Sequence, residues 1–310
     1  TSGKNDRVER LGEGGMRVER APAGDLRYSD CVRGDEALRR SFFDLAKKTF
    51  GLDFTFWYEN GWWGDDYVPH ALFDGGRAVA NVSANLIRTE LDGVEKRFVQ
   101  LGTVMTDPGY RGRGLASRLM EAVLEKYRGR CDGMYLYAND SVVGFYPKFG
   151  FIPAEEYACA RPVSPSGAKV RAMNMDDPRD RALLLSRYAE GNPFSALPMV
   201  GNTGLLMFYC AQFLKDCVYE IPGAGAVAVA EYEGDRMLLY DVFGGGALDE
   251  ILSALARADT RTCALGFSPL SQEGFEVLPR REEDTTLFVL GGKENPFARD
   301  RLMFPLLSHA

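Results

Sequence analysis

The stretch that decides the fold is VMTDPGYRGRGLA, residues 104–116 of the 310-residue chain. We expect a strand at residues 96–106 and a helix at residues 115–128, because Leu115, Leu119 and Val123 recur at helical spacing and form one apolar stripe. Glycine and proline are concentrated between them, at residues 107–114. The stretch therefore predicts a strand, a loop and a helix in immediate succession.

The loop has the composition of an anion-binding site. The first turn of a helix leaves backbone N–H groups unpaired, and together with the helix dipole they attract anions. Gly112 and Gly114 allow close approach and a positive φ, while Arg111 and Arg113 add charge suited to a pyrophosphate. An ordinary turn that needs glycine only for its geometry is the alternative. A Walker loop is excluded because its lysine is missing, and Ser117 stands where a dinucleotide loop requires glycine.

Residues 104–116 resemble the acetyl-CoA motif of the Gcn5-related N-acetyltransferases (GNAT). That motif, Gln/Arg-x-x-Gly-x-Gly/Ala, is matched by Arg111, Gly114 and Ala116. A second family signature is matched about twenty residues downstream by YAN at 137–139 and FYPKFGF at 145–151. The two signatures together identify residues of about 20–160 as a GNAT domain. The resemblance implies an α/β fold, of the α+β type with a mixed sheet.

The resemblance also implies how acetyl-CoA, the acyl donor, would be bound. The main chain of Val104, Met105 and Thr106 would hold the pantetheine arm and the thioester. The pyrophosphate would be held by the loop and the first helical turn, which comprise Arg111, Gly112, Arg113, Gly114, Leu115, Ala116 and Ser117. Asn139 would contact the cofactor through its amide, and Tyr146 would protonate the departing thiolate. A core aromatic is the alternative reading of Tyr146.

The acceptor site is less well defined by the sequence. Acyl transfer needs a neutral amine and hence a base, which the sequence does not identify. An aromatic and acidic segment, residues 54–67, supplies candidates for contacts with the amine, through cation–π interactions or carboxylates: Trp57, Trp62, Asp65 and Asp66. They fit equally well as core aromatics and solvated loop charges. A lone histidine such as His70 is more often structural than catalytic.

The length predicts two domains. We expect a disordered or expression-derived tail at residues 1–15, the catalytic GNAT domain at 16–161, a linker at 162–167 and a second domain at 168–310. The second half repeats the order of elements, but no arginine precedes its Gly244-Gly245-Gly246, so we expect a degenerate GNAT-like domain that binds no acyl-CoA.

This tandem order of domains resembles aminoglycoside-acetylating proteins of the enhanced-intracellular-survival type. The shorter length, with no room for their third domain, puts the aminoglycoside substrate and their hexamer in doubt. In those relatives the C-terminal carboxylate is the base, a role that residues 308–310 could take here.

Composition excludes several classes. A net charge of −7 disfavours nucleic-acid partners, and no apolar run reaches the ~18 residues of a membrane span, so we expect a cytoplasmic protein. The six scattered cysteines and two histidines predict free thiols and no metal site.

Taken together, the signatures and the composition predict an N-acetyltransferase that moves an acetyl group from acetyl-CoA to a primary amine, of a small molecule or a peptide N-terminus. A silent acyl-CoA-binding or sensing module, and a transferase for another short acyl-CoA, are the alternatives. A homo-oligomer is left open.

Overall fold

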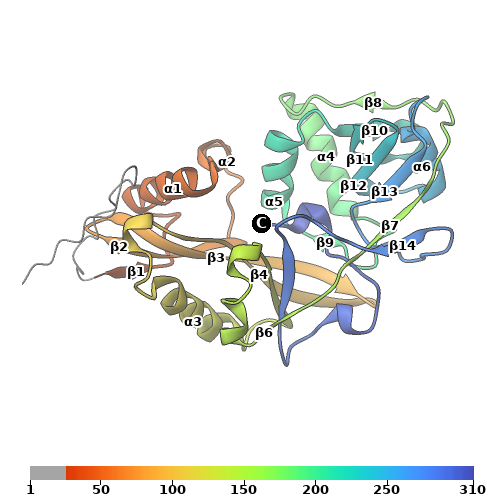
Figure 1. Cartoon of the computed structure of the whole chain (residues 1–310). Helices are drawn as coiled ribbons and strands as arrows, with labels where there is room; N and C mark the ends of the chain where they lie inside the picture. Colours follow the sequence, from red (N-terminus) through yellow and green to blue (C-terminus); the bar gives the residue numbers. More distant parts are fainter. Residues whose placement is uncertain (1–25) are drawn as a thin grey trace, which may run out of the picture.

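The computed structural model describes residues 26–310. The first half of this range supplies most strands of a mixed sheet with the strand order β1-β2-β3-β4-β5-β15-β6, in which β9 also pairs with β3. Its strands are β1 (Arg27–Ser29), β2 (Tyr67–Asp74), β3 (Arg77–Leu91), β4 (Val94–Thr106), β5 (Gly133–Ala138), β6 (Phe151–Pro153), β9 (Met199–Val200) and β15 (Thr286–Leu290). Helices α1 (Glu36–Phe50) and α2 (Thr55–Glu59) cover one face, and α3 (Leu115–Tyr127) covers the other (Figure 1). All the pairings are antiparallel except that of β4 with β5.

Local chemistry explains these elements. The hairpin between β3 and β4 turns at Asp92 and Gly93, whose φ angles of 53° and 75° fit the turn that Asp-Gly favours. The predicted stripe of α3, with Leu115, Leu119 and Val123, is buried against the sheet. The strand–loop–helix succession expected around residues 104–116 is therefore confirmed.

The second sheet has the order β14-β7-β13-β12-β11-β10-β8. Its strands are β7 (Tyr157–Pro162), β8 (Arg171–Ala172), β10 (Val218–Ile221), β11 (Ala226–Glu233), β12 (Arg236–Gly244), β13 (Thr262–Leu265) and β14 (Glu276–Pro279). Its helices are α4 (Pro178–Glu190) and α5 (Thr203–Phe208), which pack into the core between the two sheets, and α6 (Leu248–Leu255) on the opposite face. Strands β10 to β13 repeat the antiparallel, antiparallel, parallel order of β2 to β5. The expected tandem arrangement of mixed α/β units is confirmed.

The sheets do not divide where the sequence suggested. The expected boundary assigned β7 to the first domain and β15 to the second, with a linker at residues 162–167. In the structure β7 pairs with β13 and β14, while β15 inserts between β5 and β6. Leu287, Phe288 and Val289 are buried there, and β5 gains a partner that its own half of the chain does not supply. The first sheet thus takes β9 and β15 from the expected second domain, and the second sheet takes β7 from the expected first domain. The expected tail at residues 1–15 lies outside the described residues.

Short helical turns complete the fold. Residues 140–149 contain two 3-10 turns rather than a continuous α-helix, which Gly144 and Pro147 disfavour. The 3-10 turns are Pro108–Tyr110, Asp140–Val142, Tyr146–Phe149, Pro222–Ala224, Pro296–Ala298 and Leu306–Ser308, and a π-helical turn at Tyr209–Phe213 extends α5. All six cysteines are unpaired. Within residues 26–310, no helix has both the length and the apolar character needed to cross a bilayer.

Candidate active site

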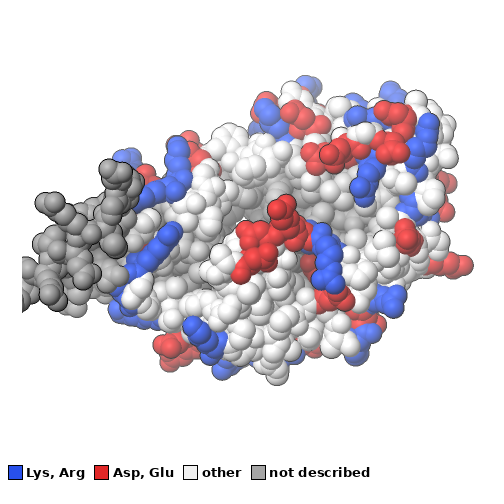
Figure 2. Space-filling view, viewed as in Figure 1, with Lys and Arg blue, Asp and Glu red and all other residues white. Residues whose placement is uncertain are grey.

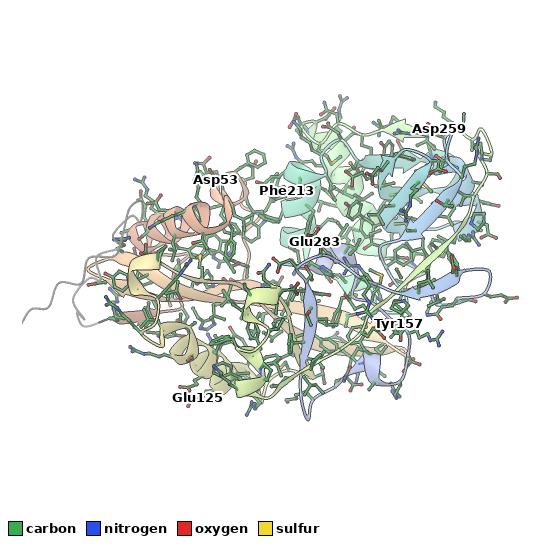
Figure 3. The ribbon with its side chains drawn as sticks, viewed as in Figure 1. Asp53, Glu125, Tyr157, Phe213, Asp259 and Glu283 are labelled. Atoms are coloured by element: carbon green, nitrogen blue, oxygen red, sulfur yellow. The ribbon has the colours of Figure 1, made fainter. Side chains whose placement is uncertain are left out.

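A cleft opens where β4 separates from β5. The two strands are paired from Phe98 to Leu101 of β4, and β4 then continues alone to Thr106. The cleft has a volume of about 1000 Å³ and is lined along its length by residues 100–106. Figure 2 shows the hollow in the middle of the molecule, with acidic residues on its near rim. Glu283 lies at this rim, and Phe213, at the end of the π-helical turn, lies across the hollow from it (Figure 3).

A β-bulge shapes this part of β4. The pairing of β3 with β4 shifts register between Asn81 and Ser83, and Thr103 has a φ of 47°. Such a conformation costs energy in a residue with a Cβ, so neighbouring groups must hold it. Asn81 Nδ2 donates to Thr103 O at 2.9 Å, and the Tyr67 hydroxyl is bonded to Thr103 Oγ1 at 2.9 Å. Beyond Leu101 the edge of β4 that faced β5 has no strand partner, so its main chain can pair with an extended ligand.

The predicted phosphate loop lies at one end of the cleft. Gly112 and Gly114 have φ angles of 75° and 73°, the left-handed conformation expected of them. Gly114 is the N-cap of α3 and no side chain caps the helix within the described residues, so the N–H groups of its first turn are left for a ligand. Arg111 and Ala116 line the cleft. This end therefore has the free main-chain donors that the predicted anion site needs.

Two charged residues stabilise the loop rather than face the cleft. Asp107 is buried, accepts from Gly109 N at 2.9 Å and is paired with Lys48 and Arg77, which lower the pKa of its carboxyl group against the effect of burial. Arg113 lies over the Tyr110 ring at 4.7 Å and donates to Gly109 O. The structure thus gives Arg113 a packing role beside the charge predicted for it.

The two residues expected from the second signature both line the cleft. Tyr146 is buried, which raises its pKa to about 12, and its hydroxyl has no hydrogen-bond partner among the described residues. Asn139 lies at the rim, where its Nδ2 donates to Asp284 Oδ2 at 2.8 Å. The phenol is therefore free to bond to a ligand, whereas the amide of Asn139 already has a protein partner.

The last residues of the sequence enter the same cleft. His309 and Ala310 line it, and the C-terminus is marked at the centre of the molecule in Figure 1. Gln100 Nε2 donates to Ala310 O at 3.1 Å, and the Tyr209 hydroxyl donates to His309 O at 2.5 Å. Sequence reasoning reached residues 308–310 only through the family resemblance. It missed Gln100 and Tyr209, because these contacts join positions 210 and 100 residues apart.

A buried network holds His309. The Tyr137 hydroxyl donates to Glu156 Oε1 at 3.0 Å and is 2.8 Å from His309 Nε2. Arg280 pairs with the other oxygen of Glu156 at 3.3 Å. Because the single hydroxyl proton of Tyr137 goes to the carboxylate, His309 Nε2 must carry a proton and donate. Burial lowers the pKa of His309 to about 3, so its ring is neutral.

A smaller pocket of about 190 Å³ adjoins the cleft and shares Thr103, Phe208 and Ala310 with it. Of the predicted acceptor residues, the structure brings three to its wall: Trp57, Trp62 and Asp66. Asp65 is exposed and paired with Arg33 instead. His70 lies away from both walls, bonded to the hydroxyls of Tyr28 and Tyr127, as expected of a structural histidine.

The fold and the cleft define a class of protein, the acyl-CoA-dependent N-acyltransferases. Residues 36–151 match the model of the acetyltransferase (GNAT) family, and this part of the chain is a GNAT-family domain. Comparison of the sequence with the curated proteins found no match.

Similar solved structures extend over both halves of the chain. A probable N-acyltransferase from Enterococcus faecalis V583 is 13% identical with a TM-score of 0.58, over 86% of this chain and 72% of that one. A GCN5-related N-acetyltransferase from Kribbella flavida is 16% identical with a TM-score of 0.51, over 86% and 70%. Eis1 from Mycobacterium abscessus is 13% identical with a TM-score of 0.52, over 85% and 72%. At these identities the likeness concerns the fold, and it covers the tandem arrangement.

Proposed function

We propose that this protein transfers an acetyl group from acetyl-CoA to a primary amine, at one site per chain. One observation carries the proposal. A single cleft runs from Arg111 and Ala116 of the phosphate loop, past residues 104–106, to Tyr146 and Ala310. It therefore joins an anion site, an open strand edge and an unpartnered phenol in the order that a thioester of coenzyme A requires.

The donor would bind largely through the main chain. The pyrophosphate would accept hydrogen bonds from N–H groups at residues 112–117, supported by the charge of Arg111. The pantetheine amides would pair with the exposed edge of Val104, Met105 and Thr106, as an added half-strand. Phe50, Val142 and Phe213 are exposed at the cleft and would cover the apolar parts of the arm.

The reaction needs one nucleophilic attack and two proton movements. The neutral amine nitrogen attacks the thioester carbonyl, a C–N bond forms and the C–S bond breaks. An N–H group near Met105 or Thr106 would stabilise the oxyanion. Tyr146 would give its proton to the thiolate and regain one after the product leaves. With a pKa of about 12 Tyr146 stays protonated at neutral pH, so a proton is present on the phenol when the thiolate departs.

If the protein ends at Ala310, the carboxylate of this residue is the base we propose, in keeping with the tandem proteins that the sequence resembles. Ala310 lines both the cleft and the smaller pocket, so an amine entering from the pocket would meet it before the thioester. The neutral ring of His309 and the amide of Gln100 would hold this residue in place. The proton removed from the amine balances the proton that Tyr146 supplies to the thiolate.

The second domain would contribute no donor site. A Cβ at Gly244 would lie 2.7 Å from Gly225 O, and one at Gly246 would lie 3.1 Å from Ala224 O. The turn at Pro222–Ala224 thus packs against the loop that corresponds to the phosphate loop. This close packing supports the prediction that the second domain binds no acyl-CoA.

The test is release of free thiol from acetyl-CoA in the presence of a panel of primary amines, with the acetylated product confirmed by mass. We expect thiol release that depends on the amine, and at least a tenfold lower turnover in Tyr146→Phe. Tight binding of acetyl-CoA without thiol release from any amine would instead indicate a silent binding module. Faster turnover with propionyl- or succinyl-CoA would replace acetyl-CoA as the proposed acyl donor, and the proposed class of reaction would stay the same.

A further inference from the structure

One carboxylate in the smaller pocket has no partner. Asp66 lines the pocket just before β2 and is half-buried, and burial raises the pKa of its carboxyl group. Within the described residues no hydrogen bond or ion pair reaches this carboxylate. Arg88 interacts with it electrostatically, but the Arg88 guanidinium donates to Gly201 O at 3.1 Å. A half-buried carboxylate without a partner is costly unless a cation offsets it.

Much of the remaining pocket wall is aromatic, and two of its polar groups have protein partners. Trp57 Nε1 donates to Gly204 O at 2.7 Å, and the Tyr67 hydroxyl is bonded to Thr103 Oγ1. The aromatic rings of Trp57 and Trp62 border the same space as Asp66. Ring faces beside a carboxylate form a site for an organic ammonium group. The pocket volume of about 190 Å³ is below the ~300 Å³ at which ligand sites for drug-sized molecules begin, so a multi-ring aminoglycoside does not fit.

Asp66 is too far from the thioester to act on the reacting nitrogen. Tyr67, the next residue, is paired with Asn85, which is paired with Gln100 of β4. Two strand spacings amount to about 10 Å. In the proposed function, acyl transfer takes place along β4, beside Ala310. Asp66 therefore faces the distal end of an acceptor whose reacting nitrogen lies at β4.

We infer that the acceptor is a compact α,ω-diamine, with one nitrogen acetylated beside Ala310 and the other held as an ammonium group by Asp66. The inference rests on the proposed function and names its substrate class. The aliphatic chain lies between the aromatic walls, and its length matches the separation of the two polar ends. A monoamine of the same length would leave Asp66 uncompensated.

The experiment compares 1,5-diaminopentane with 1-aminopentane as acceptors, by thiol release from acetyl-CoA. We expect kcat/KM for the diamine to be about tenfold or more higher, the value of one hydrogen bond to a charged group. Asp66→Asn should bring the two amines to within about threefold of each other. Glu59→Gln, the same change at an exposed position of the same segment, is the control and should keep the wild-type ratio. Melting curves of both variants confirm folding.

The outcomes separate the two proposals. A wild-type enzyme that turns over both amines equally, or prefers kanamycin or a peptide N-terminus, overturns the diamine inference and leaves the acetyltransferase intact. An unchanged ratio in Asp66→Asn also overturns the inference, because the second ammonium would then be bound elsewhere. Absence of thiol release with every amine overturns the proposed function and the inference with it.

Discussion

Gly102 of β4 offers a direct way to displace Ala310. A Cβ at this position would lie 2.9 Å from the carbonyl carbon of Ala310 and 2.3 Å from its oxygen, and the second distance is more than 1 Å inside the 3.4 Å of an ordinary contact. The φ angle of Gly102 is not in the left-handed region, so alanine fits the strand itself. The clash is relieved when Ala310 withdraws from the cleft, which breaks its hydrogen bond with Gln100. We therefore expect Gly102→Ala to lower the free energy of unfolding by only about 1 kcal/mol.

The effect on activity should be much larger. If Ala310 supplies the base, its displacement should lower kcat by about 10²-fold or more, the contribution of a positioned acid or base. The assay is thiol release at saturating acetyl-CoA, with thermal unfolding measured on the same samples. Gly129→Ala is the matched control, since a Cβ there meets nothing within 4 Å. Equal turnover by the two variants would refute the catalytic placement of Ala310.

Three further predictions concern stability. Burial raises the pKa of Asp241 to about 7, so this carboxyl group destabilises the fold as pH rises from its unfolded pKa of about 3.9 towards 7. Asp241→Asn should therefore raise the melting temperature at pH 8, and an unchanged melting temperature would contradict the raised pKa. Burial lowers the pKa of His70 to about 4, so up to about 3 kcal/mol of stability is lost as pH falls from 6.5 to 4, and urea unfolding of His70→Gln should show a shallower loss than the wild type. Asp107→Ala removes the cap of the turn before the phosphate loop. We expect the free energy of unfolding in urea to fall by about 1–2 kcal/mol and acetyl-CoA to bind more weakly. An effect on stability alone would show that the loop keeps its shape without this carboxylate.

Local sequence patterns predict much of the fold. The α3 stripe, the Asp92-Gly93 turn and the positive φ angles at Gly112 and Gly114 all follow from residue chemistry over a few positions. The exchange of β7 and β15 between the sheets could not be predicted in this way. Each strand pairs with residues about 100 or more positions away, and an apolar run such as Leu287–Leu290 does not reveal which sheet it joins.

The residues of the candidate site also divide into those that local sequence patterns predict and those that they do not. The donor end was expected from two signatures, and the structure brings their residues to one cleft. The roles of these residues stay predictions until a ligand is bound. Gln100, Tyr209 and the Tyr137–Glu156 pair were missed, because no local pattern marks a polar residue that meets the end of the chain. Asp65 and Asp66 were indistinguishable in sequence, whereas in the structure Asp65 is exposed and paired with Arg33, and Asp66 lines the smaller pocket.

Titration of the full chain with acetyl-CoA by calorimetry tests the central claim most directly. We predict one molecule bound per chain, and loss of binding in Gly114→Asp, because a carboxylate and a strained φ would replace the open N-terminus of α3. Gly245→Asp, at an unobstructed glycine of the second domain's loop, should leave both stoichiometry and affinity unchanged. Two sites per chain, unaltered binding by Gly114→Asp, or no binding at all would contradict the account.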